Sequence, residues 1–404
     1  MTKKASHEAL ALIHRRAVEI IPEADLRHKM ERSQRTGKPL RVKLGVDPTA
    51  PDIHLGISIP LQKLRDFQDL GHTAVMIVGD FTARIGDPSE RNTTRPILSL
   101  EQIERNMKTY REQAFKILDP DKTEFRYNSE WLESMSFKEI MELTSKYTVA
   151  RMLERDDFSV RYREGQSITI LEFLYPLAQA YDSVAVQADV ELGGTDQRFN
   201  LLVGREIQER YGQEPQAIVI MPLLEGTDGV RKMSKSYGNY IGITEPPNTM
   251  YGKLMSIPDS MMEKFVTLLT DVHWAKLKKL HPKEQKSALA GEIVKIYHGE
   301  EAAKAATAEF DRVFSQGGRP QDVPKVSVTR SQLKPDGTIW IVDLLQVTGL
   351  LRSRSEARRI IEQGGVELDG QKISSAQTDV KIKNGALLRV GKHRFAEIQV
   401  HEGA

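Results

Sequence analysis

The sequence has 404 residues, 39% of them hydrophobic and 28% charged, which is enough for about two or three domains and excludes a disordered or fibrous protein. The formal net charge of +2 creates no overall attraction to polyanions, so any contact with a nucleic acid has to come from a local patch. The absence of cysteine excludes disulfides, thiolate zinc sites and cysteine nucleophiles. No apolar stretch approaches the roughly 20 residues of a membrane helix, so we expect a soluble, cytoplasmic protein.

The first part of the chain predicts alternating helices and strands. Apolar residues at helical spacing predict a helix over 9–21, and a basic connector follows over 32–38. A short strand is then predicted over 40–46, a helix over the apolar periodic run that ends at Gly71, and a buried parallel strand over the β-branched run 73–78. This order is typical of a right-handed crossover unit in a nucleotide-binding α/β domain.

Two loops, 47–57 and 86–89, follow the carboxyl ends of these strands, which is where open parallel sheets bind ligands. His54 and Gly56 fall at or near the first turn of the next helix. The helix dipole and the free backbone N–H groups there favour a phosphate, the glycine lets a flat base approach the backbone, and the imidazole adds a donor. A His-Leu-Gly triplet is a weak signal when it stands alone.

The middle of the chain continues the pattern. Residues 101–118 predict one amphipathic helix and residues 137–155 one or two more, and we expect their charged faces to point to water. Further along, a helix is predicted over 199–211 and a β-branched strand over 217–221. These segments supply the scaffold of an α/β domain.

The apolar segment 168–182 carries polar side chains at regular positions. Tyr175, Gln179 and Asp182 recur at the three- and four-residue spacing of one helix face. Buried polar groups are costly unless they are paired, so this stripe forms either a structural network or the wall of a polar pocket. Helix geometry alone leaves both interpretations open.

Two later segments have the composition of ligand-binding loops. Residues 193–197 combine paired glycines, which permit a close backbone approach, with a carboxylate and an amide. In the segment 226–240, Lys232 and Lys235 stand three residues apart with serine hydroxyls around them. Two such lysines can lay positive charge along a polyphosphate, and the alternative is a solvated Lys/Ser surface turn.

Taken together, these motifs resemble a bacterial tyrosyl-tRNA synthetase, over the whole chain and most closely in the longer bacterial form. The segments that carry the resemblance, in order and at the family's spacing, are 47–56, 86–89, 175–182, 193–197 and 232–236. The first and last are shared by all class I synthetases, so they indicate only the class. The amino-acid pocket indicates tyrosine.

The resemblance implies the fold class and the domain plan. The class is α/β, with a Rossmann-like parallel-sheet catalytic domain, then an α-helical anticodon-arm domain and a small α/β S4-type RNA-binding domain. Helical periodicity over 249–314, the lack of periodicity over 316–337 and a mixed pattern after 339 agree with this plan. The expected divisions are 1–247 for the catalytic domain with its inserted dimerisation segment, 248–315 for the helical domain, 316–338 for a linker and 339–404 for the S4-like domain.

The implied reaction is amino-acid activation followed by transfer to tRNA. A tyrosine carboxylate attacks the α-phosphorus of ATP, pyrophosphate leaves, and the tyrosyl group then esterifies the terminal ribose of tRNA(Tyr). The implied partners are L-tyrosine, ATP accompanied by Mg²⁺, tRNA(Tyr) and a second copy of the chain, with no membrane and no protein metal site. Such catalysis consists of positioning and of stabilising the charge on the leaving group.

The resemblance also implies roles for individual residues. Thr49 and His54 would hold the phosphates, Lys232 and Lys235 the pyrophosphate, and a second cationic pair would add to them. The catalytic set is Thr49, His54, Arg91, Arg95, Lys232 and Lys235. The ATP-binding set is Gly56, Ile57, Gly194, Asp196 and Lys235.

In the tyrosine pocket, three residues would hold the ammonium group of the substrate, Gln197 its carboxylate and Asp182 its hydroxyl. The ammonium residues are Asp87, Tyr175 and Gln179. Lys43, near the phenol, and Asp47 complete the tyrosine-binding set. A site built to hydrogen-bond a hydroxyl rejects the analogue without it by roughly 10⁴ to 10⁵, so Asp182 is the predicted determinant of selectivity against phenylalanine.

Three positions depart from the family pattern. Lys43 stands where the short-form enzymes carry a tyrosine near the substrate phenol, although a lysine there fits the longer form, so the second contact to the hydroxyl stays open. The other two bear on catalysis. Ile57 stands where the first motif ends in histidine, and the loss of one hydrogen bond there would cost about 1 to 3 kcal/mol. Glu90 stands where a glycine is usual, and it adds a negative charge beside the cations. These departures keep open an RNA-binding, synthetase-like protein with impaired catalysis. A tryptophan-activating enzyme is a further alternative, against which Asp182 argues.

The end of the chain resembles an S4-type RNA-binding domain, through a helix and Gly-Gly-Val turn over 355–366 followed by short strands. The expected RNA-binding residues are Arg352, Arg354, Arg358 and Arg359. They would form a local basic face suited to RNA phosphates, although the whole chain is nearly neutral. A solvated arginine-rich helix is the alternative.

Overall fold

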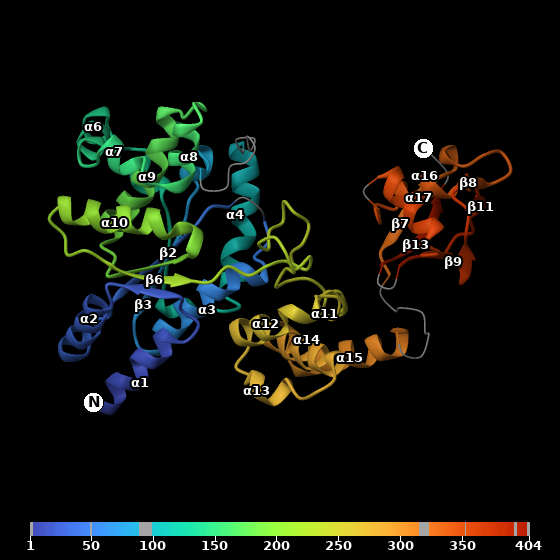
Figure 1. The fold of residues 1–404 in the computed structure, drawn as a ribbon, viewed down its shortest axis with the longest axis horizontal. Coiled ribbons are helices and arrows are strands. Elements are labelled where there is room, and N and C mark those ends of the chain that lie inside the picture. The colour runs from blue at the N-terminus through green and yellow to red at the C-terminus, as the bar shows by residue number, and fades with distance from the viewer. Residues whose placement is uncertain are drawn as a thin grey trace. The chain divides into compact units, whose positions relative to one another are not determined.

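The computed structural model describes residues 3–48, 51–88, 99–314, 323–351, 353–391 and 394–401. A six-stranded sheet, ordered β1-β6-β5-β2-β3-β4, forms the centre of the first part of the chain (Figure 1). Strands β2 to β6 run parallel, and β1 joins β6 antiparallel at the edge. The strands are β1 (Glu19–Ile21), β2 (Arg41–Val46), β3 (Thr73–Val78), β4 (Thr123–Tyr127), β5 (Val190–Gly194) and β6 (Ala217–Met221).

The expected parallel strands are confirmed, and their burial explains their composition. Every side chain of β6 is buried, as are all but the first of β3, which is the setting in which β-branched runs form parallel strands. From β2 the chain moves outward to β3 and β4, and it returns on the other side of β2 with β5 and β6. This reversal beside β2 is a topological switch point, and ligands bind beyond the carboxyl ends of the strands at such points.

Helices cover both faces of the sheet. Figure 1 shows α9 and α10 on one side of the strands and α1 and α2 on the other. Helix α3 connects β2 to β3. The helices are α1 (Lys3–His14), α2 (Glu23–Thr36), α3 (Leu55–Asp69), α4 (Leu100–Ala114), α5 (Ser129–Leu132), α6 (Phe137–Ser145), α7 (Val149–Met152), α8 (Asp156–Arg163), α9 (Ile170–Val186) and α10 (Arg198–Arg210). None of the described helices is long and apolar enough to cross a membrane.

Two expectations near the N-terminus were wrong. The first helix ends at His14 rather than Ile21, because Arg16 adopts a left-handed conformation (φ 67°) and the apolar residues after it form edge strand β1. Most of the supposed connector over 32–38 belongs to α2, which ends where Gly37 takes the left-handed C-cap conformation (φ 70°). Polar side chains along most of α2 had concealed its helical pattern.

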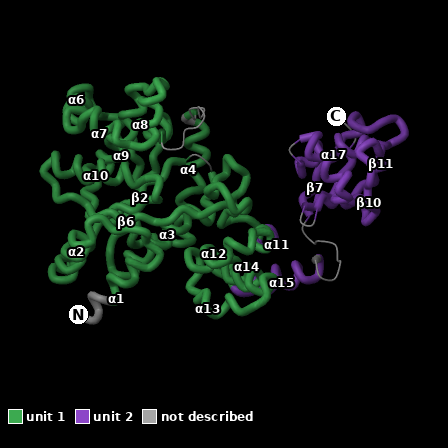
Figure 2. Tube along the Cα trace, viewed as in Figure 1, with its two compact units in different colours: residues 1–246, 253–299 green, residues 247–252, 300–404 purple. Residues whose placement is uncertain are grey.

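From Pro247 to Phe314 the chain is mainly helical, as the periodicity over 249–314 predicted. The helices are α11 (Pro247–Met255), α12 (Met262–Leu269), α13 (Trp274–Leu277), α14 (Pro282–His298) and α15 (Glu300–Phe314). The expected core residues of this region are all buried, namely Met261, Phe265, Leu268, Leu269, Ile293, Val294 and Tyr297. The chain divides into two compact units, one formed by 1–246 with 253–299 and the other by 247–252 with 300–404 (Figure 2).

The C-terminal part of the second unit is a small α/β structure. Its five-stranded sheet has the order β10-β9-β12-β13-β7, and β11 pairs with β8 separately. Its strands are β7 (Lys325–Thr329), β8 (Thr338–Trp340), β9 (Val366–Leu368), β10 (Gln371–Ile373), β11 (Asp379–Lys381), β12 (Ala386–Val390) and β13 (Arg394–His401), and its helices are α16 (Ile341–Val347) and α17 (Arg354–Glu362). Strand β7 lies inside the stretch expected to be linker, because its five residues pair in parallel with β13.

Candidate active site

The carboxyl ends of the central strands bring distant parts of the chain together. Asp47 follows β2, Gly79 follows β3, and β5 ends at Gly194. The hydroxyl of Tyr175 on α9 donates a 2.8 Å hydrogen bond to Asp47 Oδ2, and Thr82 Oγ1 donates one of 2.8 Å to Oδ1. A Cβ at Gly79 would lie 2.1 Å from Asp47 Oδ1, so only glycine leaves room for this carboxylate.

Asp182 is the most enclosed carboxylate of the predicted pocket. Trp131 Nε1 donates to its Oδ1 at 2.8 Å, and Asn128 Nδ2 donates to its Oδ2 at 3.3 Å. Burial raises the pKa of Asp182 to about 7, although the charge of Lys43 and the two hydrogen bonds oppose the rise. Sequence reasoning missed Asn128 and Trp131, because they follow β4 in a segment without a recognisable motif.

Lys43 is fully buried and is held by three partners. Its Nζ lies 2.8 Å from Glu191 Oε1, and it donates to Ser183 Oγ at 2.8 Å and to the Gln179 carbonyl at 3.0 Å. The lysine therefore joins β2 to α9 and β5 within the sheet domain. Removing one partner of such a buried ion pair costs about 3–5 kcal/mol, because the other charge is left uncompensated.

A second polar network occupies the predicted ammonium end. Gln197 Nε2 donates to Asp87 Oδ2 at 2.7 Å, and Arg155 donates to Asp87 Oδ1 at 3.2 Å. Asn200 Nδ2 donates both to Gln179 Oε1 at 3.0 Å and to Gln197 Oε1 at 3.1 Å. Three of the predicted pocket residues are thus joined in one hydrogen-bonded set.

Arg155 corrects the expectation that the charged side chains of 137–155 point to water. Only 5% of its side chain is exposed, and it is the N-cap residue of α8. The rings of Phe158 and Phe199 lie 5.1 Å and 6.0 Å from its guanidinium carbon. A lone arginine between two short helices carries no signal in the sequence that would place it beside a pocket.

His54 stands at the start of α3, as expected. It is the N-cap, and its Nδ1 accepts a 3.1 Å hydrogen bond from the backbone N–H of Gly56. A Cβ at Gly56 would lie 3.0 Å from the imidazole, so the ring packs tightly against this turn. Burial, together with the nearby charge of Lys232, lowers the pKa of His54 to about 4, so the ring is neutral at pH 7. Ile57 lies in the first turn and is only partly buried.

The lysine loop, which carries the two predicted lysines, lies beside this turn, since a Cβ at Gly56 would be 3.6 Å from Met233 Cβ. Lys232 Nζ donates to Asp196 Oδ2 at 3.2 Å, and Lys235 Nζ donates to Asp52 Oδ2 at 2.8 Å. Buried Asn239 holds the loop from within, because its Nδ2 donates to Asp228 at 3.1 Å and its Oδ1 accepts from the Ser234 N–H at 2.9 Å. Both predicted lysines are therefore paired with carboxylates of the first unit.

Side chains of α4 hold the loop that precedes His54. Asn106 Nδ2 donates to the Pro48 carbonyl at 2.7 Å, and the Thr109 hydroxyl donates to the Pro51 carbonyl. Gln113 donates to the same Pro51 carbonyl at 2.7 Å and accepts from the Ile53 N–H at 2.7 Å. The predicted residues Thr49, Glu90, Arg91 and Arg95 lie outside the described residues.

Comparisons with known proteins identify the family of the chain. Residues 34–315 match the family described as class I tRNA synthetases (W and Y), and residues 339–384 match the S4 domain. A tyrosine–tRNA ligase of Thermotoga maritima is 54% identical over 400 residues, which is 97% of each chain. A ligase of the same name from Aquifex aeolicus is 52% identical over 395 residues, covering 97% of this chain and 98% of the relative.

The chain belongs to the tyrosine–tRNA ligase family.

The predicted α/β fold, with its class I sheet domain and C-terminal S4 domain, is confirmed, and so is the aminoacyl-tRNA ligase class. Among solved structures, the tyrosyl-tRNA synthetase of Archaeoglobus fulgidus in complex with L-tyrosine is 25% identical, with a TM-score of 0.58 over 75% of this chain and 99% of that chain. A C-terminally truncated mitochondrial tyrosyl-tRNA synthetase of Coccidioides posadasii has a TM-score of 0.59 at 23% identity, over 74% of this chain and 91% of that chain, which supports the fold alone.

In this family member, three of the four predicted RNA-binding arginines lie on α17, and Arg352 lies outside the described residues. Arg354 donates to Asp343 at 2.8 Å, so part of its charge is already compensated. Its guanidinium and that of Arg358 lie 5.9 Å and 5.6 Å from the ring of Trp340. Arg358 and Arg359 are exposed and extend the basic face.

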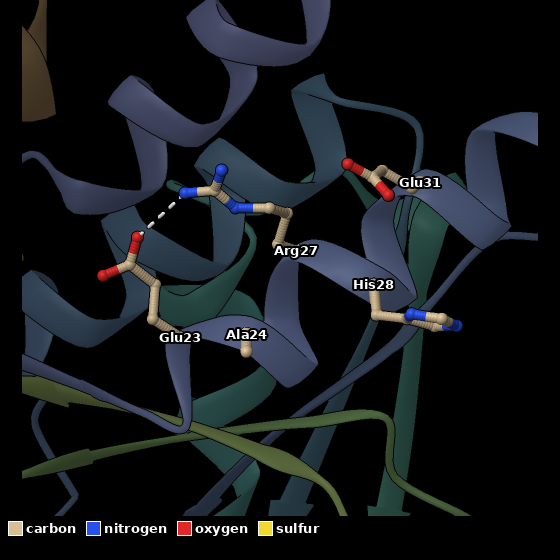
Figure 3. A pocket seen from close by; sticks show the side chains of 5 residues that line it. All are labelled: Glu23, Ala24, Arg27, His28 and Glu31. Atoms are coloured by element: carbon tan, nitrogen blue, oxygen red, sulfur yellow. Dashed lines mark hydrogen bonds and ion pairs between the residues drawn. The ribbon is translucent and has the colours of Figure 1, made fainter.

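A hollow of about 380 Å³ lies elsewhere in the synthetase, beside α2 (Figure 3). All five side chains that line it are exposed, and they come from the same helix, namely Glu23, Ala24, Arg27, His28 and Glu31. Arg27 donates to Glu23 at 3.2 Å across it. None of the predicted site residues lines this hollow, so it plays no part in the proposals below.

Proposed function

We propose that this tyrosine–tRNA ligase works in two steps, through the residue roles that follow. In the first step a carboxylate oxygen of L-tyrosine bonds to the α-phosphorus of ATP, and the bond to the bridging oxygen breaks as pyrophosphate leaves. In the second, a terminal ribose hydroxyl of tRNA(Tyr) attacks the tyrosyl carbonyl carbon and loses its proton, and AMP leaves. The observation that carries the proposal is a pair of polar networks in one unit, one around Asp182 and one around Asp87, with His54 and the lysine loop in the same unit.

Asp182 is the proposed acceptor of the phenol hydrogen, and Asp87, Tyr175 and Gln179 are the proposed partners of the ammonium group. Trp131 and Asn128 already fix both oxygens of Asp182, so the carboxylate is oriented before tyrosine arrives. Lys43 acts through the charge it places near Asp182, since its own donors are used by Glu191, Ser183 and a carbonyl. Gln197 is the proposed partner of the substrate carboxylate, and Asp47 is the proposed support of Tyr175.

On the nucleotide side, His54 is proposed to donate to a phosphate. Its Nδ1 accepts a hydrogen bond, so the neutral ring carries its proton on Nε2, and that N–H is the donor. Gly56, Ile57, Gly194 and Asp196 are the proposed contacts of the nucleoside. Lys232 and Lys235, with Thr49, Arg91 and Arg95, are the proposed charge partners of the pyrophosphate, and Mg²⁺ is expected to arrive bound to the ATP phosphates.

The contacts with tRNA and the dimer are also proposals. The arginines of α17 are proposed to contact tRNA phosphates through their exposed guanidinium groups. A homodimer is supported by exposed apolar side chains on helices α6 to α9, which lie together in Figure 1. These side chains are Phe137, Met141, Val149, Val160, Tyr162, Ile170 and Leu171. Sedimentation of the full chain tests this association.

Exchange of labelled pyrophosphate into ATP tests the activation step. We expect robust exchange with tyrosine and only weak exchange with the other standard amino acids. Exchange that depends on tryptophan instead would support the alternative within the family, although the relatives compared are named tyrosine ligases. No exchange above background from a folded sample would contradict the proposal. Exchange that appears only after Ile57→His would support an RNA-binding protein with impaired catalysis.

A further inference from the structure

Arg155 lies between two carboxylates at the ammonium end of the pocket. Its Nε lies 2.7 Å from Asp157 Oδ1 in an ion pair, and its NH2 group donates to Asp87 Oδ1 at 3.2 Å. The third arm of the guanidinium, NH1, donates to Asn200 Oδ1 at 3.3 Å. Each nitrogen of the rigid fork therefore has its own oxygen partner, an arrangement that a lysine ammonium cannot reproduce.

A buried cation beside an ammonium site raises an electrostatic problem. Asp87 is the proposed partner of the substrate ammonium, yet Arg155 alone would neutralise it and would repel the incoming positive charge. Asp157 supplies the missing charge. With Asp87, Arg155 and Asp157 all ionised, one positive and two negative charges leave one net negative charge for the ligand.

The same arginine also sets the orientation of the amides in the pocket. Because Asn200 Oδ1 faces Arg155, the Nδ2 group of Asn200 faces Gln179 and Gln197. Both glutamines then direct Oε1 toward Asn200, and Gln197 directs Nε2 toward Asp87. Rotation of the Asn200 amide would place two donors or two acceptors face to face, so the arginine fixes one arrangement of the set.

We propose that Arg155 and Asp157 are positioning residues of the amino-group subsite: Arg155 holds Asp87 and Asn200 in place, and Asp157 cancels the arginine charge so that Asp87 can attract the ammonium group of the substrate. This inference rests on the proposed function, because it presupposes that Asp87 binds the amino group of tyrosine. It assigns a role to two residues of the α7–α8 corner for which the motifs gave no expectation.

The test compares two probes that each lack one end of tyrosine. Tyramine keeps the ammonium group and lacks the carboxylate, whereas 3-(4-hydroxyphenyl)propanoate keeps the carboxylate and lacks the ammonium group. Binding of both probes and of L-tyrosine is measured by titration calorimetry on the full chain. In the Asp157→Asn variant we expect affinity for tyramine and L-tyrosine to fall about tenfold or more, with propanoate affinity changed less than about twofold.

The neighbouring residue provides a matched control. Asp156 lies one position earlier in the first turn of α8 and is exposed, so Asp156→Asn makes the same chemical change away from Arg155. We expect this variant to bind both probes like the unmodified protein. Because the propanoate probe uses the phenol end, its unchanged binding also shows that Asp157→Asn is folded.

The double variant Arg155→Met/Asp157→Asn separates the charge effect from a structural one. If Asp157 serves to cancel the arginine charge, removing both groups should restore part of the tyramine affinity lost in Asp157→Asn. Equal losses for both probes, no loss for either, or a double variant weaker than Asp157→Asn would overturn the inference. A wild-type chain that binds neither L-tyrosine nor tyramine would overturn the proposed function together with it.

Discussion

The two ends of the site hold their charges in different ways. At the phenol end, Lys43 and Glu191 are 0% and 1% exposed and have several hydrogen-bond partners. At the nucleotide end, Lys235 and Asp52 are 35% and 34% exposed and form a simple ion pair. Exposed pairs contribute only about 0–1 kcal/mol, whereas breaking a buried one costs about 3–5 kcal/mol. Under the proposed roles, the phenol end is held in place before the substrate arrives, and Lys235 would exchange its carboxylate partner for a phosphate at smaller cost.

We expect the largest effect from a substitution that removes the carboxylate of Asp182 at the phenol end. In Asp182→Asn, the amide has one acceptor oxygen for Trp131, Asn128 and the substrate hydroxyl, and it has lost its charge. We expect the preference for tyrosine over phenylalanine, measured as the ratio of kcat/KM values in pyrophosphate exchange, to fall by about 10² to 10⁴.

Exposed Asp69, which pairs with Arg65, provides the control variant Asp69→Asn, for which we expect no change in that ratio. An unchanged ratio in Asp182→Asn would remove this carboxylate from tyrosine selection. A general loss of activity for both amino acids would instead indicate a damaged fold, and thermal unfolding of the variant distinguishes the two outcomes.

We expect the second-largest effect from a substitution of Lys235 at the proposed nucleotide end. We expect Lys235→Ala to lower kcat for pyrophosphate exchange by about 10² to 10³, because the lysine stabilises the leaving group in the transition state. The KM for tyrosine and the free energy of unfolding should change little, since the pair with Asp52 is only half-buried. Lys334→Ala, which breaks an exposed pair with Asp379 in the second unit, is the control. A variant that loses stability and keeps its kcat would show that Lys235 has a structural role and no catalytic one.

The smallest expected effect is a dependence of tyrosine binding on pH. The pKa of Asp182 is about 7 in the free protein, so below pH 7 the carboxyl is protonated and has to lose its proton before it accepts the phenol hydrogen. We expect L-tyrosine affinity to fall about tenfold between pH 8 and pH 6, as measured by calorimetry. Asp182→Asn should bind more weakly and lose most of this dependence. A dependence of equal size in that variant would assign it to another group, such as Asp47, whose pKa burial also raises to about 7.

For these carboxyls, the free energy of unfolding of the free protein depends on pH in the opposite direction from the affinity for tyrosine. A raised pKa in the folded state gives Asp47 and Asp182 a contribution that is present below their ordinary pKa of 3.8 and is lost as pH rises to about 7. His54 and His72 behave in reverse, since their pKa values fall from 6.5 to about 4 on folding and their contribution is lost as pH falls through that range. The two effects partly cancel in the same window.

The sequence predicted the parts of the site that carry local patterns. Runs of β-branched residues predicted β3 and β6, and the position of His54 at the start of α3 followed from the strand and helix around it. Residues that act through long-range contacts could not be found in this way. Asn128 and Trp131 reach Asp182 from 54 and 51 positions away, and Arg155 reaches Asp87 from 68. Their side chains have no spacing that links them to a motif.

The hydrogen bonds from α4 to the loop before His54 make the position of that loop depend on the register of the helix. Asn106, Thr109 and Gln113 reach the loop because their spacing places them on one face of the helix. Each residue of an α-helix advances by about 100°, so one inserted residue between Asn106 and Gln113 would turn one anchor away from the loop while the other stayed. Exposed side chains of α4 can therefore change freely during evolution, whereas insertions and deletions within this stretch would be rejected.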